Sequence, residues 1–244
     1  MIHLSVNVNK VATLRNSRGG AVPSVVEAVR VCLEAGTAGI TVHPRADRRH
    51  ITAADVREIA RELSTHRHVE FNVEGDPRPD LLALVQDVKP HQCTLVPVAP
   101  GEITSQTGWP AETPRAELGG IVRQLQDLGV RVSLFVEPNP EPVQWAASLG
   151  AKRVELYTEP FARAVERGPS DARRSFEIYA AAATLAHSLG LEVNAGHDLD
   201  LGNLMMFREL PHLAEVSIGH ALISRALFVG LDRAVRDYLR VLGR

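Results

Sequence analysis

The segment Leu189-Gly-Leu-Glu-Val-Asn194 contains the pattern that decides the fold of this chain. A helix-like stretch ends at Leu189-Gly190, and a short run of strand-like residues begins immediately afterwards. Glycine just past the end of a helix is the usual left-handed cap, because it has no Cβ to clash there. The same form recurs at Leu33-Glu-Ala-Gly36, Leu128-Gly129 and Leu149-Gly150. Repetition of helix, glycine and strand predicts parallel strands joined by crossover helices.

Strands and helices are expected to alternate strictly along the whole chain. We expect strands near residues 2–8, 39–43, 69–74, 92–96, 130–136, 153–157, 191–195 and 214–218. We expect helices near residues 23–35, 53–63, 79–88, 115–128, 140–148, 171–188, 200–209 and 221–240. This alternation favours a closed barrel over an open doubly wound sheet, and such a barrel typically takes about 250 residues. The sequence therefore predicts an α/β protein, a single (β/α)8 TIM barrel over residues 1–244, with room for short extra helices.

The composition excludes several classes of protein. The chain has 27 basic and 29 acidic residues, so it carries no electrostatic footprint for nucleic acid or an anionic membrane. No apolar run approaches the roughly 20 residues of a membrane span, and no secretory signal precedes the strand pattern at Ile2. Cys32 and Cys93 lie in different expected elements, which disfavours a disulfide framework or a metal cluster. We expect a soluble, cytoplasmic protein that binds neither nucleic acid nor membrane.

Polar and apolar residues alternate inside the expected strands. Val69, Phe71 and Val73, for example, alternate with Glu70, Asn72 and Glu74. The helices of a barrel need an apolar outer surface, so the polar set must face inward. Interior carboxylates and amides are costly unless they pair or bind something. Two interpretations stay open for Asn72, Glu155 and Glu192. They form a polar network inside the barrel whose members hydrogen-bond one another, or they belong to a functional site. For polar groups at the C-terminal ends of strands a site is favoured.

The ten histidines divide by the end of the barrel at which they should lie. Six precede strands or lie on a helix, and we expect them to be exposed or capping residues: His3, His66, His68, His91, His187 and His212. Four follow strands, where the loops build a pocket: His43, His50, His197 and His220. Imidazole gives and accepts protons near neutral pH, so this set indicates acid–base chemistry. The histidines lack HxH or HExxH spacing, and we expect no metal site.

Basic residues in the same loops indicate a phosphorylated ligand. Arg15 and Arg18 follow the first strand, and Arg45, Arg48 and Arg49 follow the second. The Ile218-Gly-His-Ala221 turn joins the last strand to the last helix, where this fold commonly binds phosphate. Arginine suits phosphate because its planar fork makes two charge-assisted hydrogen bonds. Two basic clusters and a glycine-bearing turn predict a substrate, or substrates, with one or two phosphates.

Four long motifs give the chain a family resemblance. They are Asn7-Val-Asn-Lys-Val-Ala-Thr-Leu-Arg-Asn-Ser-Arg-Gly19, Ile40-Thr-Val-His-Pro-Arg-Ala-Asp-Arg-Arg-His-Ile51, Val193-Asn-Ala-Gly-His-Asp198 and Val216-Ser-Ile-Gly-His-Ala-Leu-Ile223. The chain resembles the pyridoxine 5′-phosphate synthase family of vitamin B6 biosynthesis, essentially from end to end. The resemblance implies a (β/α)8 barrel that condenses 3-amino-2-oxopropyl phosphate with 1-deoxy-D-xylulose 5-phosphate. It implies the products pyridoxine 5′-phosphate, phosphate and water, no metal or organic cofactor, and a homo-oligomer, often an octamer.

The resemblance also assigns roles to residues. His43 and Glu70 correspond to the family's proton acceptors, and His197 corresponds to its proton donor. The residues expected to hold the deoxyxylulose phosphate are Arg45, His50 and Thr104. The residues expected to hold the amino-ketone phosphate are Asn7, Arg18, Gly219 and His220.

Three residues depart from the better-known form of the family. Asn9-Lys10 stands where that form has Asp-His, and Asp198 stands where it has Gly. Lys10 adds a positive charge beside the expected deoxyxylulose phosphate site, to which we assign Asn9 and Lys10. Asp198 adds a negative charge beside His197, and we assign it to the amino-ketone site, where it can pair with the substrate's ammonium or repel a phosphate. The changes look like the signature of a second branch of the same family.

Two other functions remain open on the residues alone. One is a different phosphosugar isomerase, epimerase or aldolase on the same barrel, for which Lys10 is the candidate Schiff-base lysine. The other is a non-catalytic barrel that binds a phosphorylated ligand, although a mere binder does not need several proton-transfer groups. The segment from Val98 to Pro114 is the candidate lid, because loops above about 12 residues in compact domains are usually functional or disordered.

Overall fold

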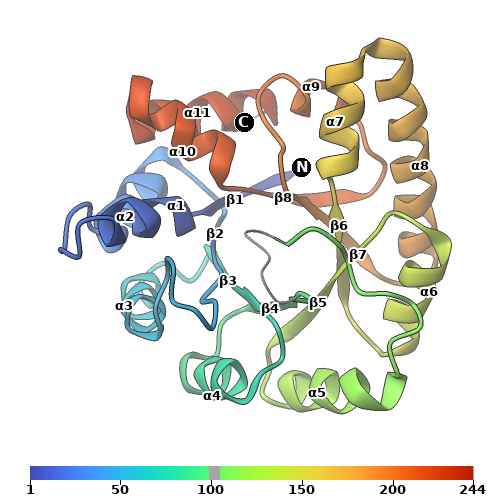
Figure 1. Cartoon of the computed structure of the whole chain (residues 1–244), viewed down its shortest axis with the longest axis horizontal. Helices are drawn as coiled ribbons and strands as arrows, with labels where there is room; N and C mark the ends of the chain where they lie inside the picture. The colour runs from blue at the N-terminus through green and yellow to red at the C-terminus, as the bar shows by residue number, and fades with distance from the viewer. Residues whose placement is uncertain (99–104, 244) are drawn as a thin grey trace.

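Eight parallel strands close into a barrel in chain order, which confirms the predicted (β/α)8 architecture. A computed structural model describes residues 1–98 and 105–243. The strands are β1 (His3–Asn7), β2 (Gly39–Val42), β3 (Glu70–Gly75), β4 (Gln92–Leu95), β5 (Arg131–Val136), β6 (Arg153–Tyr157), β7 (Glu192–Gly196) and β8 (Leu213–Ile218). β8 pairs with β1 and so closes the barrel. Figure 1 shows the strands at the centre with the longer helices arranged around them.

The helices match the expected alternation and add short ones. They are α1 (Asn9–Asn16), α2 (Val25–Ala35), α3 (Ala53–Leu63), α4 (Pro79–Val88), α5 (Arg115–Asp127), α6 (Pro140–Ser148), α7 (Glu159–Arg167), α8 (Pro169–Ser188), α9 (Leu204–Phe207), α10 (His220–Val229) and α11 (Leu231–Val241). The single helix expected at 221–240 is two helices, because Gly230 adopts a φ of 84° between them. The helix expected at 200–209 was too long, since only α9 forms there. In the described part of the chain, no helix is long and apolar enough to span a bilayer.

The glycines that the sequence assigned to helix ends have the expected backbone. Gly36 caps α2 in the left-handed region with a φ of 96°. Gly129, Gly150 and Gly190 also have positive φ, at 82°, 78° and 78°. A Cβ makes this conformation less favourable, so glycine is preferred where the helices end.

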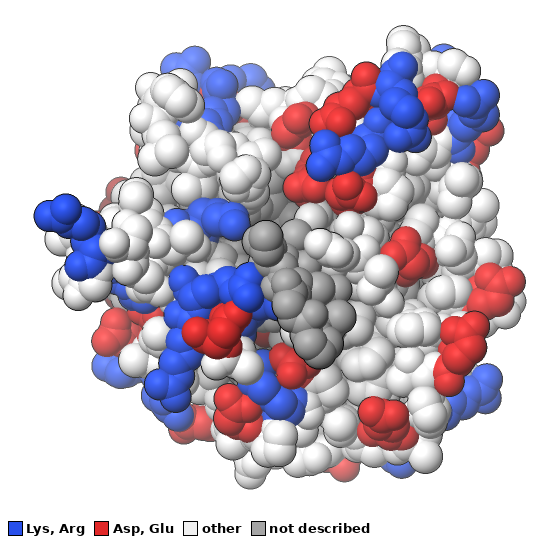
Figure 2. Space-filling model, in the orientation of Figure 1, with Lys and Arg blue, Asp and Glu red and all other residues white. Residues whose placement is uncertain are grey.

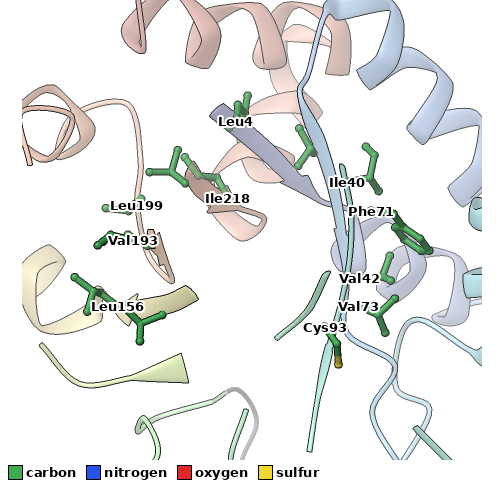
Figure 3. Close-up of a cluster of buried hydrophobic side chains, with 14 of the residues drawn as sticks. Leu4, Ile40, Val42, Phe71, Val73, Cys93, Leu156, Val193, Leu199 and Ile218 are labelled. Atoms are coloured by element: carbon green, nitrogen blue, oxygen red, sulfur yellow. The ribbon is translucent and has the colours of Figure 1, made fainter. Parts of the chain in front are cut away.

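The hydrophobic core lies between the barrel and the ring of helices. Figure 3 shows buried apolar side chains on several strands of the barrel, among them Leu4, Ile40, Val73 and Leu156. These four side chains are 0% exposed. Each buried aliphatic side chain of this size contributes about 1.5–3 kcal/mol, so this layer holds the helices on the strands. Cys93 belongs to the same layer, and burial raises the pKa of its thiol to about 12.

The polar strand residues face the barrel interior, as the alternation predicts. Thr94 donates a hydrogen bond of 3.0 Å to Asn72, and Asn72 donates one of 3.2 Å to Glu74. At the N-terminal end of the barrel, Arg153 lies 2.6 Å from Glu192 and 3.1 Å from Glu70. Asn72 and Glu192 are therefore both engaged in polar contacts with residues of neighbouring strands.

Candidate functional site

A cavity of about 470 Å³ opens at the C-terminal ends of the strands. The histidines that the sequence placed at this end all line it: His43, His50, His197 and His220. Figure 2 shows Lys and Arg side chains gathered on this face over the segment between β2 and α3. Parallel strands bring their C-terminal ends together, so residues far apart in the sequence meet around one cavity.

His43 directly follows β2 and is buried in the cavity wall. Its backbone N–H donates a 2.9 Å hydrogen bond to the Asn9 side chain. Its Nδ1 lies 4.0 Å from Glu74 Oε2, and its Nε2 has no hydrogen-bond partner within the described chain. Burial, with the positive charges of Arg45 and Arg78 nearby, lowers the pKa of His43 to about 3. The imidazole is therefore neutral at pH 7 and has a lone pair that can accept a proton.

Two buried carboxylates, Glu74 and Glu155, line the floor of the cavity. Burial raises the pKa of Glu74, and the neighbouring charges of Glu155 and Glu215 raise it further. Burial also raises the pKa of Glu155 to about 7. The Oε2 atom of Glu155 has no hydrogen-bond partner among the described residues. A raised pKa lets a buried carboxyl group hold a proton at a higher pH than an exposed one does, which suits general acid–base chemistry.

Glu70, expected to be a proton acceptor, does not line the cavity. It is the first residue of β3, at the opposite end of the barrel, where it pairs with Arg131 and Arg153. Glu74 lies four positions further along β3 than Glu70, which is about 13 Å along the strand. Alternation puts both side chains inside the barrel, but it does not say how deep each lies. The structure therefore does not bring Glu70 to the cavity. Glu74, which the sequence analysis did not single out as a site residue, lines it instead.

His197 and Asp198 follow β7 and form a close pair. His197 Nδ1 lies 3.3 Å from Asp198 Oδ2. The His197 ring also meets the Tyr157 ring edge to face, with centroids 5.2 Å apart. Contact with His197 holds the pKa of Asp198 below its ordinary value. A carboxylate and an imidazole therefore lie side by side in the cavity wall.

One part of the cavity wall is strongly basic. Lys10, Arg45, Arg49 and His50 all line the cavity, and Asn9 lies beside Lys10. Burial, with the charges of Lys10 and Arg45, lowers the pKa of His50 to about 4. Arg45 and His50 are buried, whereas Lys10 and Arg49 are exposed. Basic side chains close together attract an anion such as a phosphate.

Two of the predicted arginine ligands lie elsewhere. Arg15 is held by both oxygens of Asp55, at the start of α3. Arg18 is exposed just past the end of α1, and neither of the two lines the cavity. α1 was not expected from the sequence; Arg15 lies near its end, and Arg18 follows it. Thr104 and part of the candidate lid lie outside the described residues.

The β8–α10 turn forms the second candidate anion site. Asn7, Gly219 and His220 line the cavity there. A Cβ on Gly219 would lie 3.1 Å from the Cβ and Cγ atoms of Asn7, so glycine permits this close approach. α10 begins at His220, and the N–H groups at a helix start favour a phosphate. Among the described residues, no group of three His, Cys, Asp or Glu side chains could hold a metal ion.

Comparisons with known proteins point to one family. A family model described as pyridoxal phosphate biosynthesis protein PdxJ matches residues 4–244. A pyridoxine 5′-phosphate synthase of Christiangramia forsetii is 49% identical over 243 residues, which cover 99% of this chain and 100% of that protein. The synthase of Bacteroides thetaiotaomicron is 50% identical over 239 residues, which cover 98% of each chain.

Solved structures with low sequence identity share the fold. Phosphoribosylanthranilate isomerase from Thermotoga maritima superposes with a TM-score of 0.62 at 12% identity, covering 100% of this chain and 99% of that one. A 4-hydroxy-2-oxoglutarate aldolase gives a TM-score of 0.64 at 16% identity, covering 98% of this chain and 93% of that one. At these identities the likeness concerns the barrel alone.

Proposed function

Because the chain belongs to the PdxJ family of pyridoxal phosphate biosynthesis proteins, we propose that it is a pyridoxine 5′-phosphate synthase. Its cavity would condense 3-amino-2-oxopropyl phosphate with 1-deoxy-D-xylulose 5-phosphate and release phosphate and water. One observation carries the proposal. Two separate anion-binding regions share one cavity with the acid–base groups His43, Glu74, Glu155 and His197.

The two regions suit two phosphorylated substrates. The basic wall would hold the deoxyxylulose phosphate through Asn9, Lys10, Arg45 and His50, and Thr104 is assigned to the same substrate by the resemblance. The β8–α10 turn would hold the amino-ketone phosphate through Asn7, Gly219 and His220. Arg18 is left out of this site because it lies outside the cavity. Asp198 lies beside His197, and His220 of the second region contributes to lowering the pKa of Asp198.

The reaction needs proton transfers in both directions. Joining an amine to a ketone, losing water and phosphate, and closing an aromatic ring each require them. The neutral imidazole of His43 would accept protons, and His197 would donate them. Glu74, rather than Glu70, would be the second proton acceptor, with Glu155 beside it on the cavity floor. The side chains supply this chemistry themselves, so we expect the reaction to proceed without a metal or organic cofactor.

We also propose that the protein is a homo-oligomer, octameric by the resemblance, and acts in the cytoplasm. The end of α10 supports self-association, because Leu227, Phe228 and Val229 are 68%, 88% and 40% exposed in succession. Contiguous exposed apolar side chains of this kind mark interaction surfaces. Size-exclusion chromatography with light scattering would measure the assembly, and a monomer at micromolar concentration would contradict it.

The function is tested by mixing the protein with both substrates in metal-free buffer. Pyridoxine 5′-phosphate and released phosphate are followed together. The expected result is product from the wild type and losses of roughly 100-fold or more in His43→Ala, Glu74→Gln and His197→Ala, since acid–base groups contribute about 10²–10⁴-fold. Glu70→Gln is the matched control for Glu74→Gln, because it makes the same change on the same strand outside the cavity. Folded protein that binds both substrates without forming product would refute the proposal.

Borohydride trapping and the product assay together separate the two alternative functions, an aldolase and a non-catalytic binding barrel. An aldolase that uses Lys10 would form a Schiff base with its substrate, which borohydride would trap covalently in the wild type but not in Lys10→Met. In the synthase proposed here Lys10 binds phosphate, so we expect no covalent trapping at Lys10. A non-catalytic barrel would bind ligands with no product in any variant.

A further inference from the structure

The turn after β7 has an unusual backbone. His197 and Asp198 are successive non-glycine residues in the left-handed region, with φ of 87° and 57°. Side chains make this region unfavourable, although His, Asp and Asn enter it more often than other residues. Glycine adopts it with no Cβ penalty. Such conformations persist where the surroundings enforce them, and they cluster at functional sites.

The backbone of this turn is held from several sides. The Thr158 hydroxyl donates a 2.7 Å hydrogen bond to the Gly196 carbonyl and also bonds the His197 carbonyl. Asn203 Nδ2 donates a 2.9 Å hydrogen bond to the Asp198 carbonyl. These contacts use only main-chain atoms of residues 196–198. The turn therefore does not need the Asp198 carboxylate in order to form.

The carboxylate of Asp198 instead lies beside the His197 ring, at ion-pair distance from Nδ1 but without the alignment of a hydrogen bond. Oδ2 lies 3.3 Å from Nδ1, and the side chains of His197 and Asp198 are 20% and 35% exposed. Both residues line the cavity. The charged or titratable groups that bear on Asp198 are His197 in the same turn, Arg163 on α7 and His220 on α10. The edge-to-face contact with Tyr157, with an interplanar angle of 71°, sets the plane of the His197 ring.

We propose that Asp198 is a positioning residue that holds His197 through Nδ1 and makes Nε2 the ring nitrogen that exchanges protons with the substrate. A carboxylate on one imidazole nitrogen selects the tautomer with its proton there, and it also stabilises the imidazolium that a proton donor must become. The inference rests on the proposed function for its catalytic consequence, but the tautomer of His197 can be observed in the resting protein.

The first test needs no activity. Histidine is labelled with ¹⁵N, and the His197 signals are identified by their loss in His197→Ala. In the wild type we expect a proton on Nδ1, and in Asp198→Gly we expect that preference to disappear. Identical His197 signals in the two proteins would overturn the proposal, whether or not the protein makes pyridoxine 5′-phosphate.

The second test asks whether Asp198 acts through His197. Asp198→Asn keeps the shape of the side chain but removes its charge, and asparagine also tolerates positive φ. We expect kcat to fall by roughly 10- to 100-fold, as for other residues that orient a reacting imidazole. In the His197→Ala background the same change should lower kcat by less than about twofold, because coupled residues are not additive. Equal losses in both backgrounds would refute the positioning role.

The stability and kinetics of Asp198→Gly separate this role from its rivals. Asp198→Gly should raise Tm, because glycine fits the backbone, while kcat falls. A higher Tm with unchanged kcat would show that Asp198 affects only the conformation of the turn, and would overturn the proposal. A rise in KM for the amino-ketone phosphate with unchanged kcat would make it a ligand for the substrate's ammonium, and would equally overturn the proposal. Glu166→Gln is the control, since it removes a carboxylate beside Arg163 that does not touch His197.

Discussion

Replacing Arg153 with Met should destabilise the barrel strongly without touching the cavity. Arg153 is 6% exposed and lies inside the N-terminal end of the barrel. It donates hydrogen bonds of 3.1 Å to Glu70 and 3.0 Å to Gln92, and it lies 2.6 Å from Glu192. Methionine has a similar length but no charge, so the variant leaves these partners without their shared cation.

The loss in free energy of unfolding depends on whether each partner of Arg153 keeps contact with water or with another cation. Glu192 has a side chain that is 56% exposed and can turn to water, and Glu70 keeps Arg131. Glu215, 3.9 Å from Arg153 with a side chain 2% exposed, loses its neighbouring cation inside the barrel, which matters most at pH values where Glu215 is ionised. Removing one member of a buried ionic group lowers the free energy of unfolding by about 3–5 kcal/mol. Because Glu192 can be solvated after the change, we expect a loss of about 3 kcal/mol. For a chain of this length that corresponds to a fall in Tm of about 6–12 °C.

The loss should also depend on pH in a defined direction. Burial and the charge of Glu70 raise the pKa of Glu215 to about 8 in the folded protein, whereas Arg153 lowers it. A carboxyl group with a raised folded pKa removes stability as pH rises from its unfolded value towards its folded value. Without Arg153 the folded pKa of Glu215 is higher still. The deficit of the variant should therefore be larger at pH 9 than at pH 6.

Thermal unfolding followed by circular dichroism at pH 6 and pH 9 measures both effects. Arg163→Met is the matched control, because Arg163 makes two ion pairs but its side chain is 56% exposed, so its Tm should stay close to that of the wild type. A fall in Tm for Arg153→Met as small as that of the control would refute the reasoning. So would a deficit that is the same at both pH values.

Three other predictions concern the cavity. Gly219→Ala places a Cβ 3.1 Å from Asn7, so KM for the amino-ketone phosphate should rise several-fold in steady-state assays; an unchanged KM would remove this turn from the site. Glu155→Gln should gain stability relative to the wild type as pH rises from about 4.5 to about 7, because the folded pKa of Glu155 is raised to about 7; melts at both pH values that show the same difference would contradict this. Lys10→Met should raise KM for 1-deoxy-D-xylulose 5-phosphate roughly tenfold, the size of one charge-assisted hydrogen bond, and should leave KM for the other substrate alone; equal effects on both would place Lys10 between the two phosphates.

The sequence by itself determined the barrel and the end at which its site lies. Helix-ending glycines such as Gly129 and Gly190 are local features, since positive φ depends on the residue and its immediate neighbours. Alternation along a strand likewise depends only on the two-residue repeat, so it correctly turned Asn72 and Glu155 inward. Histidines that follow strands must lie at the C-terminal end of a parallel barrel, and so His43 and His197 meet at the cavity.

Only the tertiary structure decided depth and partners. Glu70 and Glu74 share a strand and a face, and they differ in the layer of the barrel that each reaches. The cations Arg131 and Arg153 that hold Glu70 come from β5 and β6, far away in the sequence. Arg15 has the same chemistry as Arg45, but Asp55 on α3 takes up its charge. Which charges meet is a matter of distance through folded space, and that distance is set by packing between elements rather than by any local pattern of residues.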